Sequence, residues 1–168
     1  MLVNLIGFNL CWIGLIVLGN SFVPIALIWL SIHIYFCKQR TAEVKLILSI
    51  TIIGTLIDSL LSFFNVLQFN SDVVDIPFIP IWLMTLWGVF ASTIAHSLKP
   101  FEHSRKIQWL IGLLLPALSY VAGSKLSSVE LGYSLFLTYF IIGSLWSFLL
   151  VLFFELKKHF YINEVIHE

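Results

Sequence analysis

Long apolar runs, each bounded by charged or turn-forming residues, follow one another along almost the whole chain. A transmembrane helix needs about 20 predominantly apolar residues, and runs close to that length occupy residues 2–18, 22–37, 44–64, 78–98, 107–123 and 133–154. Only 11% of the 168 residues are charged, whereas a soluble domain carries about 25%. The sequence therefore predicts an all-α fold, a polytopic membrane helix bundle with six transmembrane helices.

The basic residues fall almost entirely on one side of the predicted membrane. Of the nine Lys and Arg residues, only Lys125 lies in a loop on the opposite side. Because Lys and Arg in short loops stay on the cytoplasmic side during insertion, we expect both termini to be cytoplasmic. No linker-like stretch divides the chain, so we expect residues 1–156 to form a single six-span domain and residues 157–168 a short cytoplasmic tail.

The formal net charge of zero bears on the partners of the protein. Binding to nucleic acid depends on clustered Lys and Arg, so we expect no nucleic-acid partner. Membrane lipids are the expected partners, and a lipid-like substrate or a membrane protein is a further candidate. Cys11 lies mid-helix and Cys37 at a helix end, so their depths differ by more than a disulfide spans. Both are expected to be free thiols.

One face of the third run carries polar side chains. Thr55, Asp58 and Ser62 lie within about 60° of one another at about 100° per residue. Because an Asp at the centre of a membrane helix costs about 2.5–3.5 kcal/mol, we expect this face to point into the bundle. Two interpretations of Asp58 stay open: a structural carboxylate bonded to hydroxyl groups, or a proton carrier or substrate-binding group.

The fourth run has a second polar face, which Thr85, Ser92 and His96 share. Near neutral pH a histidine serves as a general base, a proton relay or a metal ligand. The alternative is a neutral imidazole bonded to a neighbouring hydroxyl group. His33, beside Trp29 on its own helix, could meet His96 at a similar depth. Because no second ligand follows His96 at metal-binding spacing along its helix, we expect no metal and no cofactor.

The fifth run and the deep tryptophans suggest a cavity. Pro116, Ser119 and Tyr120 could line it at the depth of Asp58, whereas the small residues of this helix are read as packing residues. The deep tryptophans either fill the bundle or wall a pocket for a lipid-like ligand; they are Trp12, Trp29, Trp87 and Trp146. The candidate polar cavity therefore comprises Asp58, Thr55, Ser62, Thr85, Ser92, His96, Ser119 and Tyr120.

The most distinctive residues occur in three groups: Gly54, Asp58 and Ser59, then residues 87–98, then Pro116 and Tyr120. Their order and spacing resemble those of a bacterial inner-membrane family catalogued as domain of unknown function 2878. The resemblance covers nearly the whole chain. It implies a small multi-pass protein of the bacterial inner (plasma) membrane, and it implies no particular activity.

Motifs that would settle the activity are absent, since the sequence has no phosphate-binding glycine loop and no zinc-protease helix. Whether the protein is an enzyme stays open, with three candidate functions. The first is handling of a lipid or lipid-like substrate in an intramembrane polar cavity. The second is a proton- or ion-coupled small-solute transporter, which a weak inverted match between residues 52–56 and 141–145 favours. The third is a non-catalytic membrane scaffold or accessory subunit, which the short loops favour.

Overall fold

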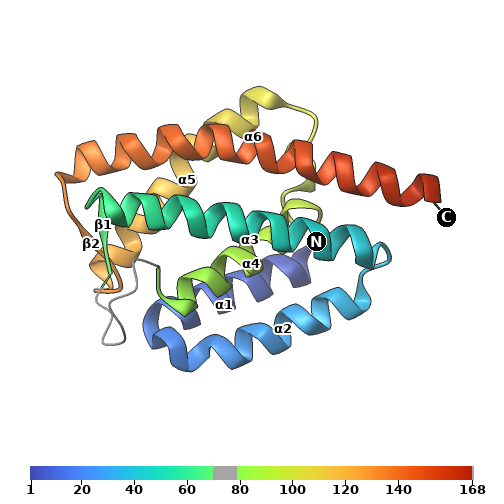
Figure 1. The fold of residues 1–168 in the computed structure, drawn as a ribbon, viewed down its shortest axis with the longest axis horizontal. Coiled ribbons are helices and arrows are strands. Elements are labelled where there is room, and N and C mark those ends of the chain that lie inside the picture. The colour runs from blue at the N-terminus through green and yellow to red at the C-terminus, as the bar shows by residue number, and fades with distance from the viewer. Residues whose placement is uncertain (70–78, 168) are drawn as a thin grey trace.

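Apolar helices account for most of the chain in the computed structural model, which describes residues 1–69 and 79–167, with side chains as far as residue 162 (Figure 1). In chain order the elements are α1 (Leu2–Leu18), η1 (Gly19–Phe22), α2 (Val23–Phe36), α3 (Arg40–Phe63), β1 (Leu67–Gln68), α4 (Ile81–Ile94), η2 (Lys99–Phe101), α5 (Arg105–Lys125), β2 (Glu130–Leu131) and α6 (Leu135–His167). The predicted all-α class is confirmed. The start of the fourth predicted run, at residue 78, lies outside the described residues.

The chain reverses direction between α1 and α2. Gly19, at φ +55°, takes a left-handed conformation that suits glycine. Pro24 lies in the first turn of α2. Backbone N–H groups in a first turn have no acceptor within the helix, so the lack of an N–H in proline costs no hydrogen bond there. The side-chain oxygen of Asn20 then accepts a hydrogen bond from the backbone N–H of Trp82 at 3.0 Å. α1 and α2 therefore form a tight hairpin, which is tied to the start of α4.

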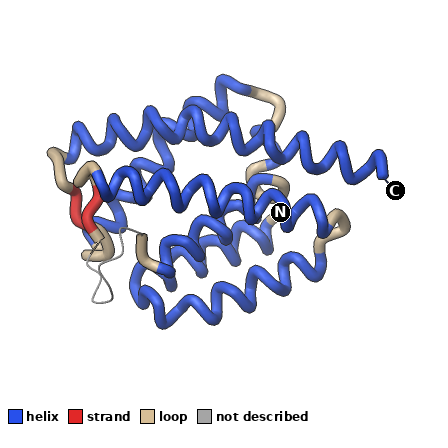
Figure 2. The backbone as a smooth tube through the Cα atoms, in the orientation of Figure 1, coloured by secondary structure: helices blue, strands red, loops and turns tan. Residues whose placement is uncertain are grey.

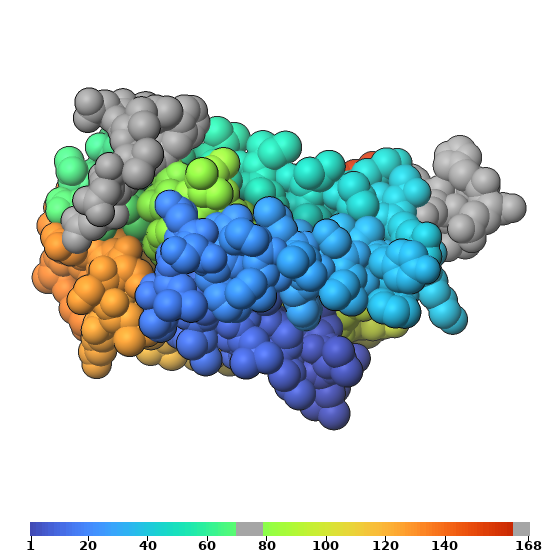
Figure 3. Space-filling model, turned by 90° about the horizontal axis from the view of Figure 1, so that it is seen from below, coloured from blue at the N-terminus to red at the C-terminus, as the bar shows by residue number. Residues whose placement is uncertain are grey.

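α4, which is as short as α2 at 14 residues, has the most central place among these helices. α4 contacts α1, α2, α3 and α6, and more than half of its residues are buried. Figure 3 shows α1 and α2 covering one face of the molecule, while α5 packs along α6. The polar side chains of Ser92 and Thr93 on α4 are consequently buried between neighbouring helices.

The two ends of the bundle differ in structure. At one end β1 and β2 pair as antiparallel strands, with Leu67 opposite Leu131 and Gln68 opposite Glu130 (Figure 2). Sequence analysis did not predict this pair, because two residues are too few for an alternating pattern to show. Both termini lie towards the other end (Figure 1).

Among the described residues, four helical stretches are long and apolar enough to cross a membrane: Leu2–Phe36, Arg40–Phe63, Arg105–Lys125 and Leu135–Ile162. The first contains the α1–α2 hairpin, and α4 is a shorter apolar helix. At 1.5 Å per residue, α1, α2 and α4 are about 21–26 Å long, which is less than the roughly 30 Å of a hydrocarbon core. The structure thus supports a membrane protein, and six crossings stay a prediction.

Large apolar side chains cover the outside of the bundle. Val3 is 82% exposed and Phe136 is 81% exposed, and similar residues follow along the other helices. Contiguous apolar surface on this scale is unusual for a monomeric soluble protein. It is the surface expected where hydrocarbon rather than water surrounds the helices.

The last helix is longer than the sixth predicted run. α6 continues from Leu135 to His167, so the predicted cytoplasmic tail, residues 157–168, is helical as far as His167. The charged residues Lys157 and Lys158 mark the end of the apolar run, but neither stops a helix. This extension matters because it carries Tyr161 to the site described below.

Candidate functional site

The predicted cavity residues divide between two places in the fold. Asp58 and Tyr120 meet in one cluster, whereas Ser92 and His96 lie in or beside another. Thr85 donates its hydroxyl hydrogen bond to the backbone oxygen of Ile81 in its own helix, at 2.9 Å. Ser62 is half-buried near the end of α3. The predicted faces point inward, but they do not form one site.

Asp58, Trp87 and Tyr120 form the first group, which we call the Asp58 cluster. One carboxylate oxygen accepts a hydrogen bond from Trp87 Nε1 and the other accepts one from the Tyr120 hydroxyl, each at 2.7 Å. The Asp58 side chain comes from α3 and is 0% exposed. Because both oxygens are bonded inside the bundle, these contacts support the structural interpretation of Asp58.

Close packing holds the Trp87 indole in place. A Cβ atom at Gly54 would lie 2.0 Å from the Trp87 ring, so only glycine leaves room for the indole against α3. On its other side Trp87 stacks on Trp146, with ring centroids 4.7 Å apart and planes 7° apart. One turn from Asp58, the buried Thr55 hydroxyl has no hydrogen-bond partner among the described residues.

A cavity of about 530 Å³ lies beside the Asp58 cluster, and we call it the aromatic cavity. Its walls come mainly from α1, α4, α5 and α6, and they include Trp12, Trp82, Trp87, Phe90, Tyr120 and Trp146. Pro116, Ser119 and Tyr120, which the sequence suggests as cavity residues, lie in its wall. Trp12 Nε1 donates a hydrogen bond to Ser119 Oγ at 2.8 Å, which joins α1 to α5.

The aromatic cavity is elongated and reaches the outer surface. It follows α1 from Leu5 to Ile16, a rise of about 17 Å. Leu115 and Leu118 on α5 line it while being 57% and 53% exposed. The cavity therefore opens sideways on to the apolar outside of the bundle.

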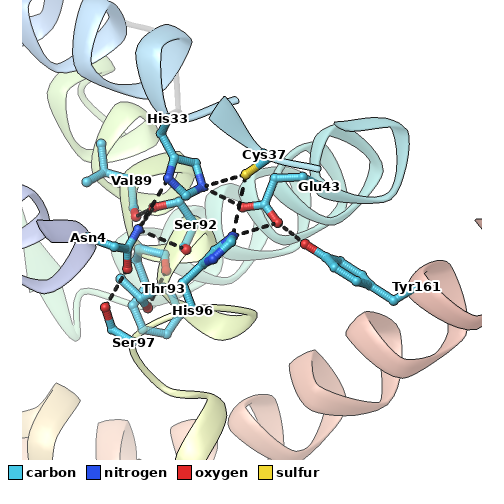
Figure 4. A network of polar contacts seen from close by, with 11 residues as sticks. Asn4, His33, Cys37, Glu43, Val89, Ser92, Thr93, His96, Ser97 and Tyr161 are labelled. Atoms are coloured by element: carbon cyan, nitrogen blue, oxygen red, sulfur yellow. Dashed lines mark hydrogen bonds and ion pairs between the residues drawn. The ribbon is translucent and has the colours of Figure 1, made fainter. Parts of the chain in front are cut away.

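His33, Cys37, Glu43 and His96 form the second group, which we call the histidine cluster (Figure 4). His33 lies in the last turn of α2, and Cys37 caps that helix. Glu43 lies in the first turn of α3, and His96 follows the end of α4. One ligand-type atom from each of the four side chains lies within 4.8 Å of the others.

Glu43 is the centre of the histidine cluster, and its side chain is 0% exposed. One of its oxygens lies 2.8 Å from His33 Nε2, and the other lies 3.5 Å from His96 Nε2. The Tyr161 hydroxyl on α6 donates a hydrogen bond to the second oxygen. A buried carboxylate requires such partners, and here they come from α2, the end of α4 and α6.

Neighbouring side chains hold the two imidazoles in place. The His33 ring stacks on Trp29, with centroids 5.5 Å apart, and meets the His96 ring at 4.7 Å. The expected meeting of His33 and His96 is thereby confirmed. The Asn4 side-chain nitrogen lies 3.5 Å from His33 Nδ1 and donates to the backbone oxygen of Ser92 at 3.2 Å. The N-terminal helix thus contributes to this site.

Burial raises the pKa of the Cys37 thiol to about 11, and the nearby negative charge of Glu43 adds to the rise. The Arg40 charge opposes this rise only in part, so the thiol is protonated and neutral at neutral pH when no metal ion binds it. Cys11 lies in a separate part of the core, and both cysteines are free thiols, as expected.

Sequence analysis missed several residues of this region: Asn4, Cys37, Glu43 and Tyr161. A signal was present for Cys37, because His33 and Cys37 are four residues apart and so share one helical face. The third apolar run begins at residue 44 in the sequence, which places Glu43 just outside the predicted helix. The structure begins α3 at Arg40, which turns Glu43 into the bundle.

The fold and its two clusters define a class: a small all-α protein whose helices have the apolar surface and length of membrane helices. Within this class, the chain belongs to the family described as protein of unknown function (DUF2878), whose profile matches residues 1–152. The resemblance seen in the sequence is thereby confirmed. The match includes the Asp58 and histidine clusters, whereas Tyr161 lies beyond it. Comparisons with curated proteins and with solved structures gave no match.

Proposed function

We propose that this protein is a multi-pass protein of the bacterial inner membrane that binds a lipid-like molecule in the aromatic cavity. The observation that carries the proposal is an elongated cavity of about 530 Å³ with aromatic walls and an opening on the apolar outer surface. Ligand pockets typically measure about 300–1,000 Å³ and combine apolar walls with a few polar groups. An apolar chain can enter such a cavity directly from the bilayer.

The polar atoms of the aromatic cavity suggest how the ligand lies. All four hydroxyl groups in the cavity wall have partners within the protein: Ser119 and Tyr120 bond to Trp12 and Asp58, and Thr93 and Ser97 bond to Phe90 and Asn4. Their positions rather than their free hydrogen bonds therefore guide the assignment, because a polar head favours the end of the cavity nearer water. Thr93 and Ser97 line it at the end of α4. We place the polar head of the ligand at that end and its apolar chain between the tryptophans.

The Asp58 cluster bears on the transport alternative. A coupling carboxylate must exchange protons with a pathway, but both oxygens of Asp58 accept hydrogen bonds within a fully buried cluster. We therefore assign Asp58 to the architecture of the cavity wall rather than to proton coupling.

We further propose six membrane crossings with both termini in the cytoplasm. In support, a second cavity of about 740 Å³ is lined by Lys99, Arg105, Lys157 and Lys158, so basic residues from two distant segments meet at one end of the bundle. A cytoplasmic position for that end follows from the tendency of Lys and Arg to stay inside. The short α1, α2 and α4 require local thinning of the bilayer, which costs only fractions of a kcal/mol per Å.

Reporter fusions test the topology. Green fluorescent protein fused after Glu168 is expected to fluoresce, and alkaline phosphatase fused at the same place is expected to be inactive, because that end stays in the cytoplasm. Phosphatase inserted after Ser127, between α5 and α6, is expected to be active. Active phosphatase at the C-terminus would contradict the proposed topology.

Photo-crosslinking tests the ligand proposal. A long-chain fatty acid carrying a diazirine is expected to label peptides from α1, α4 and α5 of the purified chain. Ala122 lines the aromatic cavity, and Ala122→Phe is expected to reduce labelling about tenfold or more. Overfilling a packed site costs about 1–3 kcal/mol, and 1.4 kcal/mol corresponds to a tenfold change.

A control variant on the same helix distinguishes blocking of the aromatic cavity from a general effect of placing a phenylalanine on α5. Leu110 is 55% exposed on α5 and does not line the aromatic cavity. Leu110→Phe is expected to leave labelling unchanged. Equal labelling of Ala122→Phe and the parent chain, with both folded by circular dichroism, would contradict binding in this cavity.

A further inference from the structure

We propose that the histidine cluster is a metal centre in which His33, Cys37, Glu43 and His96 bind one divalent transition-metal ion of the Zn²⁺ class. Sequence analysis expected no metal, since His96 has no partner at ligand spacing on its own helix. The structure supplies the other ligands from α2 and α3. The proposal is independent of the ligand assigned to the aromatic cavity.

The distances between ligand atoms match a tetrahedral centre. With Zn–S of about 2.3 Å and Zn–N of about 2.1 Å, the sulfur-to-nitrogen edge of a tetrahedron is about 3.6 Å. Cys37 Sγ lies 3.5 Å from His33 Nε2 and 3.6 Å from His96 Nε2. Both sulfur-to-nitrogen distances are therefore those that a bound Zn²⁺ would set, and all the ligand atoms lie within 4.8 Å of one another.

Glu43 supplies the fourth corner. Its Oε2 lies 3.5 Å from His96 Nε2, close to the nitrogen-to-oxygen edge of about 3.4 Å expected around Zn²⁺. Its Oε1 lies 2.8 Å from His33 Nε2, a hydrogen-bond distance. To bind an ion, His33 Nε2 must give up that hydrogen bond, and the two atoms must separate by about 0.6 Å to reach the nitrogen-to-oxygen edge. A small rotation of the Glu43 or His33 side chain would supply that separation.

The ligand types select the metal. Thiolate, imidazole and carboxylate together suit Zn²⁺ and its borderline neighbours, whereas Mg²⁺ and Ca²⁺ take oxygen ligands. One thiolate and one carboxylate also balance the two positive charges of the ion. The centre is then neutral as a whole, which suits a group enclosed by apolar helices.

Outer contacts of the kind found around metal centres are also present. The Tyr161 hydroxyl donates a hydrogen bond to Glu43, and the Trp29 ring stacks on the His33 imidazole. Such partners orient ligands, and their loss typically costs about 10–100-fold in metal affinity. Four protein ligands occupy all four coordination positions of a tetrahedral ion, as in structural zinc sites. We therefore infer that the ion links α2, α3 and the end of α4 and does not catalyse a reaction.

Metal content and cobalt spectra test the proposal. The full chain, purified in mild detergent with a tag free of histidine, is expected to contain about one Zn²⁺ per chain by mass spectrometry. After chelation and loading with Co²⁺, it is expected to show thiolate-to-cobalt charge transfer and the visible bands of tetrahedral cobalt. A folded parent chain that binds no Co²⁺, or binds it without the thiolate band, would overturn the proposal.

The two cysteines provide a matched pair of variants. Cys37→Ser is expected to abolish the charge-transfer band, whereas Cys11→Ser is expected to retain it, because Cys11 lies in a separate part of the core. Glu43→Gln is expected to weaken Co²⁺ binding by about 100-fold or more, beyond the usual loss for an outer partner. The exposed histidine control, His103→Ala, should bind as the parent does. A charge-transfer band that survives Cys37→Ser would overturn the assignment.

A second measurement avoids substitution at the site itself. In Cys11→Ser the only remaining thiol is Cys37. Its alkylation by a maleimide is expected to be slowed by Zn²⁺ and restored by a chelator, while Mg²⁺ has no effect. Alkylation at the same rate with and without Zn²⁺ would count against thiolate ligation.

Discussion

The Gly112→Ala variant is expected to unfold roughly 10 °C below the parent chain in mild detergent. Gly112 lies on α5 where it meets α6, and a Cβ atom there would be 2.5 Å from the backbone oxygen of Trp146 and 2.8 Å from Ser147 Cα. Backbone atoms cannot rotate away, so the two helices would have to separate. Overpacking costs about 1–3 kcal/mol or more, and each kcal/mol shifts Tm by about 2–4 °C at this chain length.

A second glycine on the same helix is the control. At Gly123 the nearest atom to an added Cβ is Val129 Cγ1, at an ordinary contact distance of 3.5 Å. Gly123→Ala is therefore expected to leave Tm unchanged or raise it slightly, since alanine favours a helix over glycine by about 1 kcal/mol. Circular dichroism against temperature measures both. A Gly112→Ala chain as stable as Gly123→Ala would contradict the close packing of α5 on α6.

The Asp58→Leu variant is expected to lose about 2–6 kcal/mol of stability. It removes the acceptor of both the Trp87 N–H and the Tyr120 hydroxyl, and each orphaned buried donor costs about 1–3 kcal/mol. Asp58→Asn is expected to be much closer to the parent, because the amide oxygen accepts from Trp87 and the amide nitrogen donates to the Tyr120 oxygen. Unfolding by denaturant in detergent measures the three chains.

Thr55→Val serves as the matched control for the Asp58 cluster. It lies one turn away on α3, and its buried hydroxyl has no partner among the described residues, so its removal should be neutral or stabilising. The comparison also separates the two interpretations of Asp58. If Asp58→Asn were as unstable as Asp58→Leu, the negative charge rather than the hydrogen-bond geometry would hold the cluster together.

Periodicity predicted the inward faces of the helices but not their partners. The face that carries Asp58 is buried, and Pro116, Ser119 and Tyr120 do line a cavity. A helical period of 3.6 residues says which side chains share a face, and it carries no information about which neighbouring helix that face meets. Asp58 and His96 therefore belong to separate clusters, and among the described residues Thr85 bonds to its own helix.

By itself, the sequence determined the class of fold, the family and the uneven placement of positive charge. These properties depend on local composition, on the length of apolar runs and on residue order, all of which can be read without knowing any contact. Only the tertiary structure decided which polar residues meet. The histidine cluster needs the tight turn from α2 to α3, the position of α4 between them and the extension of α6 that brings Tyr161 to Glu43. Those arrangements depend on packing between segments that are far apart in the chain, and sequence pattern does not report such packing. Glu43 is the example: it lies just outside the apolar run in the sequence, but in the fold it is the buried centre of the histidine cluster.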